Sequence, residues 1–136
     1  MADRNMADLP KFALSIRQPW AWAIVHAGKD IENRNWMHNF RGPVCIHASK
    51  SMTGMELDDA ADFMRSLDVE IPRGLELQRG GIIGTAEIVD CVDSSESPWF
   101  VGRYGFVLRN ARPVEFIPVK GLLGFFNWRW QIGGAP

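Results

Sequence analysis

One stretch decides the fold: FALSIRQPWAWAIVHAGKDIENRNW, residues 12–36. Apolar and polar side chains alternate over residues 12–17, and this period of two predicts a strand. Pro19 suits the first turn of a helix, and Gly28 stands where the left-handed residue that ends many helices is expected. From Lys29 onward the alternation returns. The stretch therefore predicts a helix held between two strands.

The second of these strands, residues 29–36, carries a high density of charge. Its even-numbered face carries Asp30, Glu32, Arg34 and Trp36. If that face is interior, a carboxylate and a guanidinium enter a cleft together, and each needs a partner there. Solvated loops also carry such charges. The pattern alone leaves a wet surface and a pocket floor as alternatives.

The rest of the chain adds strands and one more helix. Residues 42–49 and 80–93 read as strands, and residues 54–68 read as an amphipathic helix with its acids outward. Residues 99–119 read as two strands joined at Asn110–Pro113. Five or six strands with two early helices predict an α+β domain, a small and partly closed mixed β-barrel with flanking helices. The later strands read as a meander, which favours this barrel over parallel βαβ units.

Length and composition are typical of one small globular domain. The 136 residues, 46% of them hydrophobic, are enough to bury one core. We expect a flexible leader over residues 1–11, a single domain over residues 12–132 and a tail over residues 133–136. Both cysteines lie in apolar runs without a C-x-x-C spacing, which is typical of free thiols in a reducing compartment. No membrane-length apolar run and no signal-peptide pattern is present, so we expect a cytoplasmic protein with no membrane partner.

Charge is unevenly distributed, although the net charge is only −1. Residues 11–50 hold six Lys and Arg against two acids, whereas residues 51–70 hold six acids against one Arg. The net charge excludes a strongly basic nucleic-acid-binding arm. A basic, aromatic first third beside an acidic helix favours an anionic ligand on one side of the molecule.

Two further features mark candidate site residues. Arg17 and Gln18 close the first strand and Trp20 opens the helix, so an anion or a base edge could dock at this corner among helix N–H groups. Glu87 is a carboxylate on an otherwise apolar strand face, where acids pair with a base or keep a proton. A simpler alternative is that Arg17 pairs with Glu32 or Glu87 and holds the barrel together.

Three other chemistries find little support in the sequence. His47 and Cys45 share a strand face, but two ligands do not make a zinc site, so no metal and no cofactor are expected. Ser49 lacks the glycine pattern of a nucleophile elbow. The single glycine of GKDIENR lacks the spacing of a phosphate loop.

A resemblance to the ASCH domain rests on ordered motifs, LSIRQPWAWAIVHAGKDIENRNW followed by RGPVCIHAS. The later GGIIGTAEIVDCV and the C-terminal strands are similar to the single-domain bacterial and phage members, and the resemblance covers about residues 13–130. It implies a PUA-like fold, with a cleft suited to RNA or a nucleobase. The family signature G-x-K-x-x-E-x-R matches Lys29, Glu32 and Arg34, whereas the glycine stands one residue late, at Gly28.

This resemblance implies that the charged face lines a cleft and is not a wet surface. The ligand is then RNA, DNA or a free nucleoside. A base could stack on Trp20, Trp36 or Trp99, although for any single one of them a place in the core is the more common role. A phosphate could then lie near Lys29 or Arg17.

Three functions remain open at this point. A binding module for RNA or a modified nucleoside fits the basic, aromatic first third. A hydrolase is implied by family members that act on N4-acylcytidine or on RNA, but Glu32 replaces the presumed Thr nucleophile of the amidohydrolases. An interaction domain would use the acidic helix. The candidate residues are Lys29, Glu32 and Glu87 for catalysis, and Arg17, Gln18, Trp20, Arg34, Trp36, His47, Ser49 and Trp99 for ligand binding.

Overall fold

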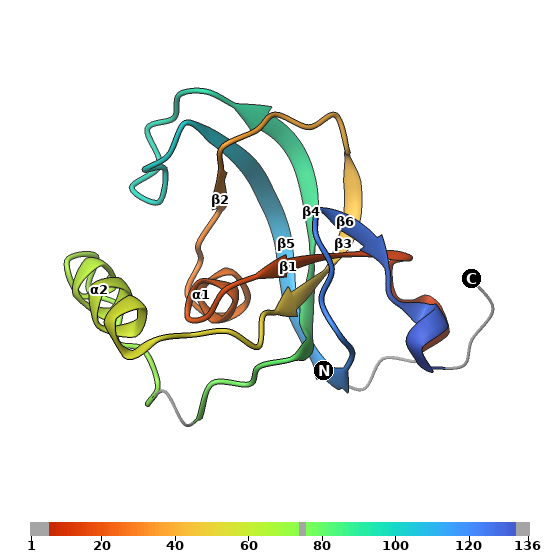
Figure 1. Cartoon of the computed structure of the whole chain (residues 1–136). Coiled ribbons are helices and arrows are strands. Elements are labelled where there is room, and N and C mark those ends of the chain that lie inside the picture. The colour runs from red at the N-terminus through yellow and green to blue at the C-terminus, as the bar shows by residue number, and fades with distance from the viewer. Residues whose placement is uncertain (1–5, 74–75, 133–136) are drawn as a thin grey trace.

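The computed structural model describes residues 6–73 and 76–132, and over that range it shows two α-helices and a curled six-stranded sheet (Figure 1). In chain order the elements are η1 (Met6–Asp8), β1 (Phe12–Ile16), α1 (Trp20–His26), β2 (Ile31–Arg34), β3 (Gly42–Ala48), α2 (Gly54–Arg65), β4 (Gly81–Val92), β5 (Tyr104–Pro118), β6 (Phe125–Asn127) and η3 (Arg129–Ile132). Here η denotes a short 3-10 helix. The predicted α+β class, with a curled mixed sheet and flanking helices, is confirmed.

The strands lie side by side in the order β2-β5-β4-β3-β1-β6. β1 and β3 pair in parallel, and the other neighbouring pairs among the described strands are antiparallel. A parallel pair needs a crossover connection, and here α1 and β2 lie within it. The predicted meander is β3-β4-β5. The charged strand β2 is carried to the far edge of the sheet, where Glu32 lies opposite Phe106 of β5.

The prediction of two strands joined at Asn110–Pro113 is wrong, because β5 runs without a break from Tyr104 to Pro118. Asn110 has a left-handed φ of 56°, and the register between β4 and β5 shifts at several points. Such shifts are typical of β-bulges, which bend a strand without ending it. Pairing with the long strand β4 therefore overrides the local turn signal.

The two faces of the sheet are packed by different groups. α1 covers one face with Ala21, Ile24 and Val25, and the cluster there includes Val44, Ile46 and Ala48 of β3. The opposite face carries a second cluster: Leu9, Ala13, Cys45, Ile82, Val114, Val119, Phe126 and Trp128. The alternation predicted for residues 42–49 is thus confirmed, since neighbouring residues of β3 enter opposite clusters.

Leu9 belongs to the second cluster, and hydrogen bonds join residues 6–10 to the C-terminal part of the domain. Leu9 is buried, the indole N–H of Trp128 donates to the carbonyl of Pro10 at 2.9 Å, and the guanidinium of Arg129 donates to three carbonyls of this segment. The described part of the predicted leader is therefore held against the domain. The predicted tail, residues 133–136, lies outside the described residues.

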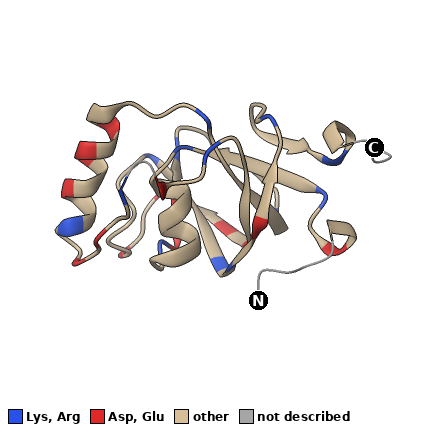
Figure 2. Ribbon diagram, turned by 90° about the horizontal axis from the view of Figure 1, so that it is seen from below, with Lys and Arg blue, Asp and Glu red and all other residues tan. Residues whose placement is uncertain are grey.

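α2 lies on the side of α1 that faces away from the sheet (Figure 1). Thr53 and Glu56 form a reciprocal capping box at its start, which satisfies two otherwise unpaired N–H groups. Acidic residues recur along this helix (Figure 2), and Asp58, Asp59 and Asp62 among them are exposed. Met64 is buried with Trp99 in a third cluster, between α1, α2 and the loop after β4. Within the described residues, no helix is long and apolar enough to cross a membrane.

Candidate ligand-binding site

A hollow of about 480 Å³, here called the aromatic pocket, lies between α1, α2 and the loop that follows β4. Its lining residues are Trp20, Lys29, Glu32, Asn33, Glu56, Asp59, Ala60, Phe63, Trp99 and Val101. The Phe63 ring lies 5.8 Å from the ring of Trp20 and 6.0 Å from that of Trp99, between centroids, so three aromatic rings form one wall. The pocket is thus shaped by segments that are far apart in the sequence.

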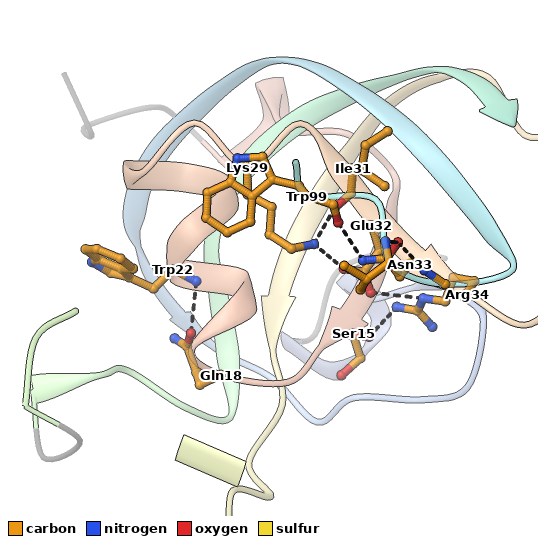
Figure 3. A network of polar contacts seen from close by, with 11 residues as sticks. Ser15, Gln18, Trp22, Lys29, Ile31, Glu32, Asn33, Arg34 and Trp99 are labelled. Carbon is orange, nitrogen blue, oxygen red and sulfur yellow. Dashed lines mark hydrogen bonds and ion pairs between the residues drawn. The ribbon is translucent and has the colours of Figure 1, made fainter. Parts of the chain in front are cut away.

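Two charged residues of this pocket, Lys29 and Glu32, form the family-signature triad together with Arg34 (Figure 3). The Lys29 ammonium donates to Glu32 Oε1 at 3.2 Å and to the carbonyl of Ile31, and Arg34 Nε donates to Glu32 Oε2 at 3.0 Å. The side chains of Lys29, Glu32 and Arg34 are only 3%, 10% and 19% exposed. Buried charges need such reciprocal partners. The sequence left a wet surface and a pocket floor as alternatives for the charges of residues 29–36. Lys29 and Glu32 are buried at a pocket, so for these two residues the wet surface is excluded.

Local structure places the lysine at this point. α1 ends at Ala27, and Gly28 adopts a left-handed φ of 74°, which turns the chain into β2. The backbone N–H of Lys29 still bonds to the carbonyl of Ala23, at 3.1 Å. The ammonium therefore returns beneath α1 and lies 5.7 Å from the Trp20 ring centroid, within cation–π range.

Asn33 fixes the loop that carries Trp99. Its side-chain amide donates to the carbonyl of Trp99 at 2.9 Å, and its Oδ1 accepts from the N–H groups of Val101 and Gly102 at 3.0 and 3.2 Å. Three bonds from one side chain order this segment. Asn33 thus supports the aromatic wall through the backbone.

A second hollow of about 940 Å³, here called the cationic pocket, lies at the ends of β1 and β3. Its charged lining residues are Arg17, Arg34, Lys50 and Lys120, and among the described residues no acid lines it. Ser15, His47, Ser49 and Ser51 add hydroxyl and imidazole groups.

Two ion pairs separate the two pockets. Glu32 lines the aromatic pocket and Arg34 the cationic pocket. In the same way Glu56 lines the first and Arg17 the second, with Arg17 Nη2 2.7 Å from Glu56 Oε1. The Arg17 bond, with those from Thr53, lowers the pKa of Glu56 to about 2, and the same carboxylate raises the pKa of Arg17. Arg17 does not pair with Glu32 or Glu87, so that expectation was wrong.

His47 and Ser15 form a fixed pair in the wall of the cationic pocket. His47 Nε2 lies 2.8 Å from the carbonyl oxygen of Val119, which can only accept, so Nε2 carries the proton. His47 Nδ1, 2.9 Å from Ser15 Oγ, is then the acceptor of the serine hydroxyl. Burial lowers the pKa of His47, against an opposing effect of the Val119 bond. The imidazole is a neutral bridge between β1, β3 and the segment after β5.

Three predicted site residues lie elsewhere. Gln18 is buried, and its amide is used within the fold, donating to the carbonyl of Gln78 and accepting from the N–H of Trp22. Trp36 packs edge-on against Phe106 and lines neither pocket.

Glu87 is the third. It receives a hydrogen bond from Asn110 and lines a different hollow, which shares no residue with the aromatic pocket. Because the β4–β5 register shifts beside it, its strand face is not the uniform one that the sequence pattern implied.

The remaining predicted residues fall into the two pockets. Lys29, Glu32, Trp20 and Trp99 line the aromatic pocket, and Arg17, Arg34, His47 and Ser49 line the cationic pocket.

Sequence reasoning missed Phe63, Lys50 and Lys120. Phe63 lies on the buried side of α2, which the helical period marked as apolar without naming what it faces. Lys50 follows β3 directly, close to predicted residues. Lys120 had no local signal, since only the return of the chain after β5 brings it to the same pocket.

Comparisons with known proteins identify the family of the chain. The sequence profile of the ASCH domain matches residues 14–102, a range that contains the triad and Trp99. Activating signal cointegrator 1 of Homo sapiens is 29% identical over 89 residues, which are 62% of this chain and 15% of that protein. The protein of the same name from Mus musculus gives the same values. The chain thus spans about 15% of the length of these curated relatives. The curled mixed sheet is consistent with a PUA-like fold. Since the profile covers more than half of its length, the chain belongs to the ASCH domain family.

Proposed function

We propose that this domain binds a nucleobase, in RNA or as a modified nucleoside, in the aromatic pocket. The observation that carries the proposal is the placement of the Lys29–Glu32 pair beside the rings of Trp20, Phe63 and Trp99. Flat rings stack on aromatic side chains, and such stacking contributes roughly 1–3 kcal/mol per base. A volume of about 480 Å³ is of the size that small-molecule sites have.

The polar groups of the pocket suit the edge of a base. An ammonium has three N–H donors, and within the described residues the nitrogen of Lys29 has two acceptors. The carboxylate of Glu32 has lone pairs beyond those that Lys29 and Arg34 use. A donor and an acceptor side by side match a base edge that presents an acceptor next to an amino or imino group.

Hydrolysis is the second function that the family resemblance implies, and the geometry favours it less. The ammonium nitrogen of Lys29 donates to a carboxylate and to a carbonyl, an arrangement that suits a donor better than a proton acceptor. Glu87 lines a different hollow from the one that holds Lys29, which does not favour a shared catalytic role. The test of binding therefore includes recovery of the ligand.

The experiment is calorimetric titration of the protein with cytidine and N4-acetylcytidine, followed by mass spectrometry of the recovered ligand. Trp20→Ala should raise the dissociation constant by about tenfold or more, as the loss of one stacking contact implies. Trp130→Ala is the matched control, because Trp130 is 55% exposed and lines neither pocket. Intact ligand supports a binding module, whereas loss of the acetyl group by wild type and not by Lys29→Ala would establish a hydrolase. Equal affinities of the two Trp variants would contradict the pocket assignment.

A further inference from the structure

We infer that the cationic pocket holds phosphate groups attached to the nucleoside whose base enters the aromatic pocket. This inference rests on the proposed function and deepens it, because it makes the ligand a nucleotide of a single-stranded RNA and not a free nucleoside. Arg17, Arg34, Lys50 and Lys120 line this pocket, and no described acid does.

Two of these cations have no counter-charge among the residues that the structure describes. Arg34 pairs with Glu32, and Arg17 pairs with Glu56. For Lys50 and Lys120, by contrast, the described part of the chain provides no ion-pair partner. Both lysines form hydrogen bonds through their own backbone atoms, to the side chains of Arg79 and Gln131. A concave surface lined by one sign of charge concentrates its field toward ligands of the opposite sign.

Hydroxyl groups complete an anion-binding lining. The Ser49 Oγ accepts from the N–H of Ser51 at 3.3 Å, so the hydroxyl can still donate its own proton to a ligand. Phosphate oxygens are acceptors, and serine hydroxyls, lysine and arginine are the side chains that commonly contact them.

The charge at the other pocket explains why the phosphate belongs here. Glu56 and Asp59 line the aromatic pocket, and their negative charge disfavours a phosphate there. The wall between the pockets is made of the pairs Arg17–Glu56 and Arg34–Glu32, whose cations face one side and whose acids face the other. The same ligand then places its base on the acidic, aromatic side and its phosphate on the basic side.

The size of the cationic pocket favours a strand over a mononucleotide. At about 940 Å³ it is roughly twice the volume of the aromatic pocket, although one phosphate is smaller than a base. It therefore has room for the phosphates on both sides of the bound nucleotide.

The test measures affinity for three probes at several salt concentrations: cytidine, cytidine monophosphate and a short single-stranded RNA that contains cytidine. RNA should bind most tightly and cytidine least. Each phosphate contact on a single strand contributes about 0.7 to the slope of log affinity against log salt. The double variant Lys50→Ala/Lys120→Ala should therefore make this negative slope shallower for RNA by about 1.4. It should also lose about tenfold in affinity for RNA at low salt. Its affinity for cytidine should not change.

The matched control is Arg109→Ala/Arg112→Ala, which also removes two charges but from exposed positions on β5 that line neither pocket. An equal loss in both double variants, or equal binding of cytidine and RNA at all salt concentrations, would overturn the phosphate site and leave the base pocket standing. RNA binding that depends on Lys50 and Lys120 but not on Trp20 would support the phosphate site and remove the proposed function. Equal affinity for the monophosphate and the RNA would keep the phosphate site and reject the strand.

Discussion

Glu32 accepts from two cations at once, with Lys29 Nζ 3.2 Å from its Oε1 and Arg34 Nε 3.0 Å from its Oε2. Arg34 continues the chain of contacts through Nη2, which donates to the carbonyl of Ser15 at 3.0 Å. One carboxylate therefore joins the floor of the aromatic pocket to the wall of the cationic pocket, and ties the edge strand β2 to β1.

Removal of this carboxylate should destabilise the protein strongly. Glu32→Ala leaves the nearly buried ammonium of Lys29 and the guanidinium of Arg34 without a counter-charge, and breaking a buried pair in this way costs about 3–5 kcal/mol. We expect the free energy of unfolding, measured by urea denaturation, to fall by about the lower of these values, since Arg34 is partly exposed.

The control for that measurement is Asp62→Ala. Asp62 pairs with Arg65 on α2 at 3.0 Å, but both side chains are largely exposed. Exposed pairs contribute about 0–1 kcal/mol, so this variant should change stability little. Similar losses in the two variants would show that the triad is no more important than a surface pair.

Asn33→Ala should loosen the loop that carries Trp99 while the triad stays intact. The backbone N–H groups of Val101 and Gly102 lose their acceptor, and hydrogen exchange at both amides should accelerate. The loss of several hydrogen bonds should cost about 2 kcal/mol. Asn33→Asp keeps the acceptor and removes the donor, so it should preserve protection at these two amides. Unchanged exchange in Asn33→Ala would refute the role of this side chain.

Local signals explain which parts of the fold could be predicted. Pro19 and Gly28 bound α1 by their own backbone preferences, and the period of two marks the strands on either side. The prediction of a break in β5 was wrong because long-range strand pairing overrode a local turn signal. Asn110 and Pro113 are turn-forming residues, but the twelve-residue strand β4 pairs along this region, and bulges absorb the irregularity.

The site divides in the same way. Glu32 and Arg34 lie two residues apart on β2, so their convergence follows from strand geometry. Lys29 precedes the strand, and it reaches Glu32 because the chain turns at Gly28. Whether Trp20, Trp36 or Trp99 faces a ligand depends on which element packs over each ring, and here α2 and Phe63 decide it. No local pattern carries that information.

Gly121→Ala should destabilise the segment between β5 and β6. A Cβ at this position would lie 2.7 Å from Cε1 of His47 and 2.9 Å from Oγ of Ser15, inside contact distance with a buried ring. Overpacking of this kind costs about 1–3 kcal/mol. Gly54→Ala is the control, since among the described residues no atom outside its own helix backbone and chain neighbours lies within 4 Å of its added Cβ. Urea denaturation should separate the two variants, and equal stabilities would show that the segment yields freely.

The neutral state of His47 should make stability depend on pH. Burial lowers the pKa of His47 in the folded protein below the ordinary value of 6.5, so below that value the unfolded chain binds a proton that the folded chain resists. The contribution is therefore fully present above about pH 6.5 and is lost as the pH falls through the folded pKa.

Between pH 7.5 and 5.5 the free energy of unfolding of wild type should decrease more than that of His47→Gln, which cannot titrate. His26 and His38 are exposed and remain in both proteins, so the difference between the two pH profiles isolates His47. A proton on Nδ1 would also force the Ser15 hydroxyl to give up its bond, at 2.9 Å, to this nitrogen. Parallel profiles would mean that protonation of His47 is tolerated in the folded state.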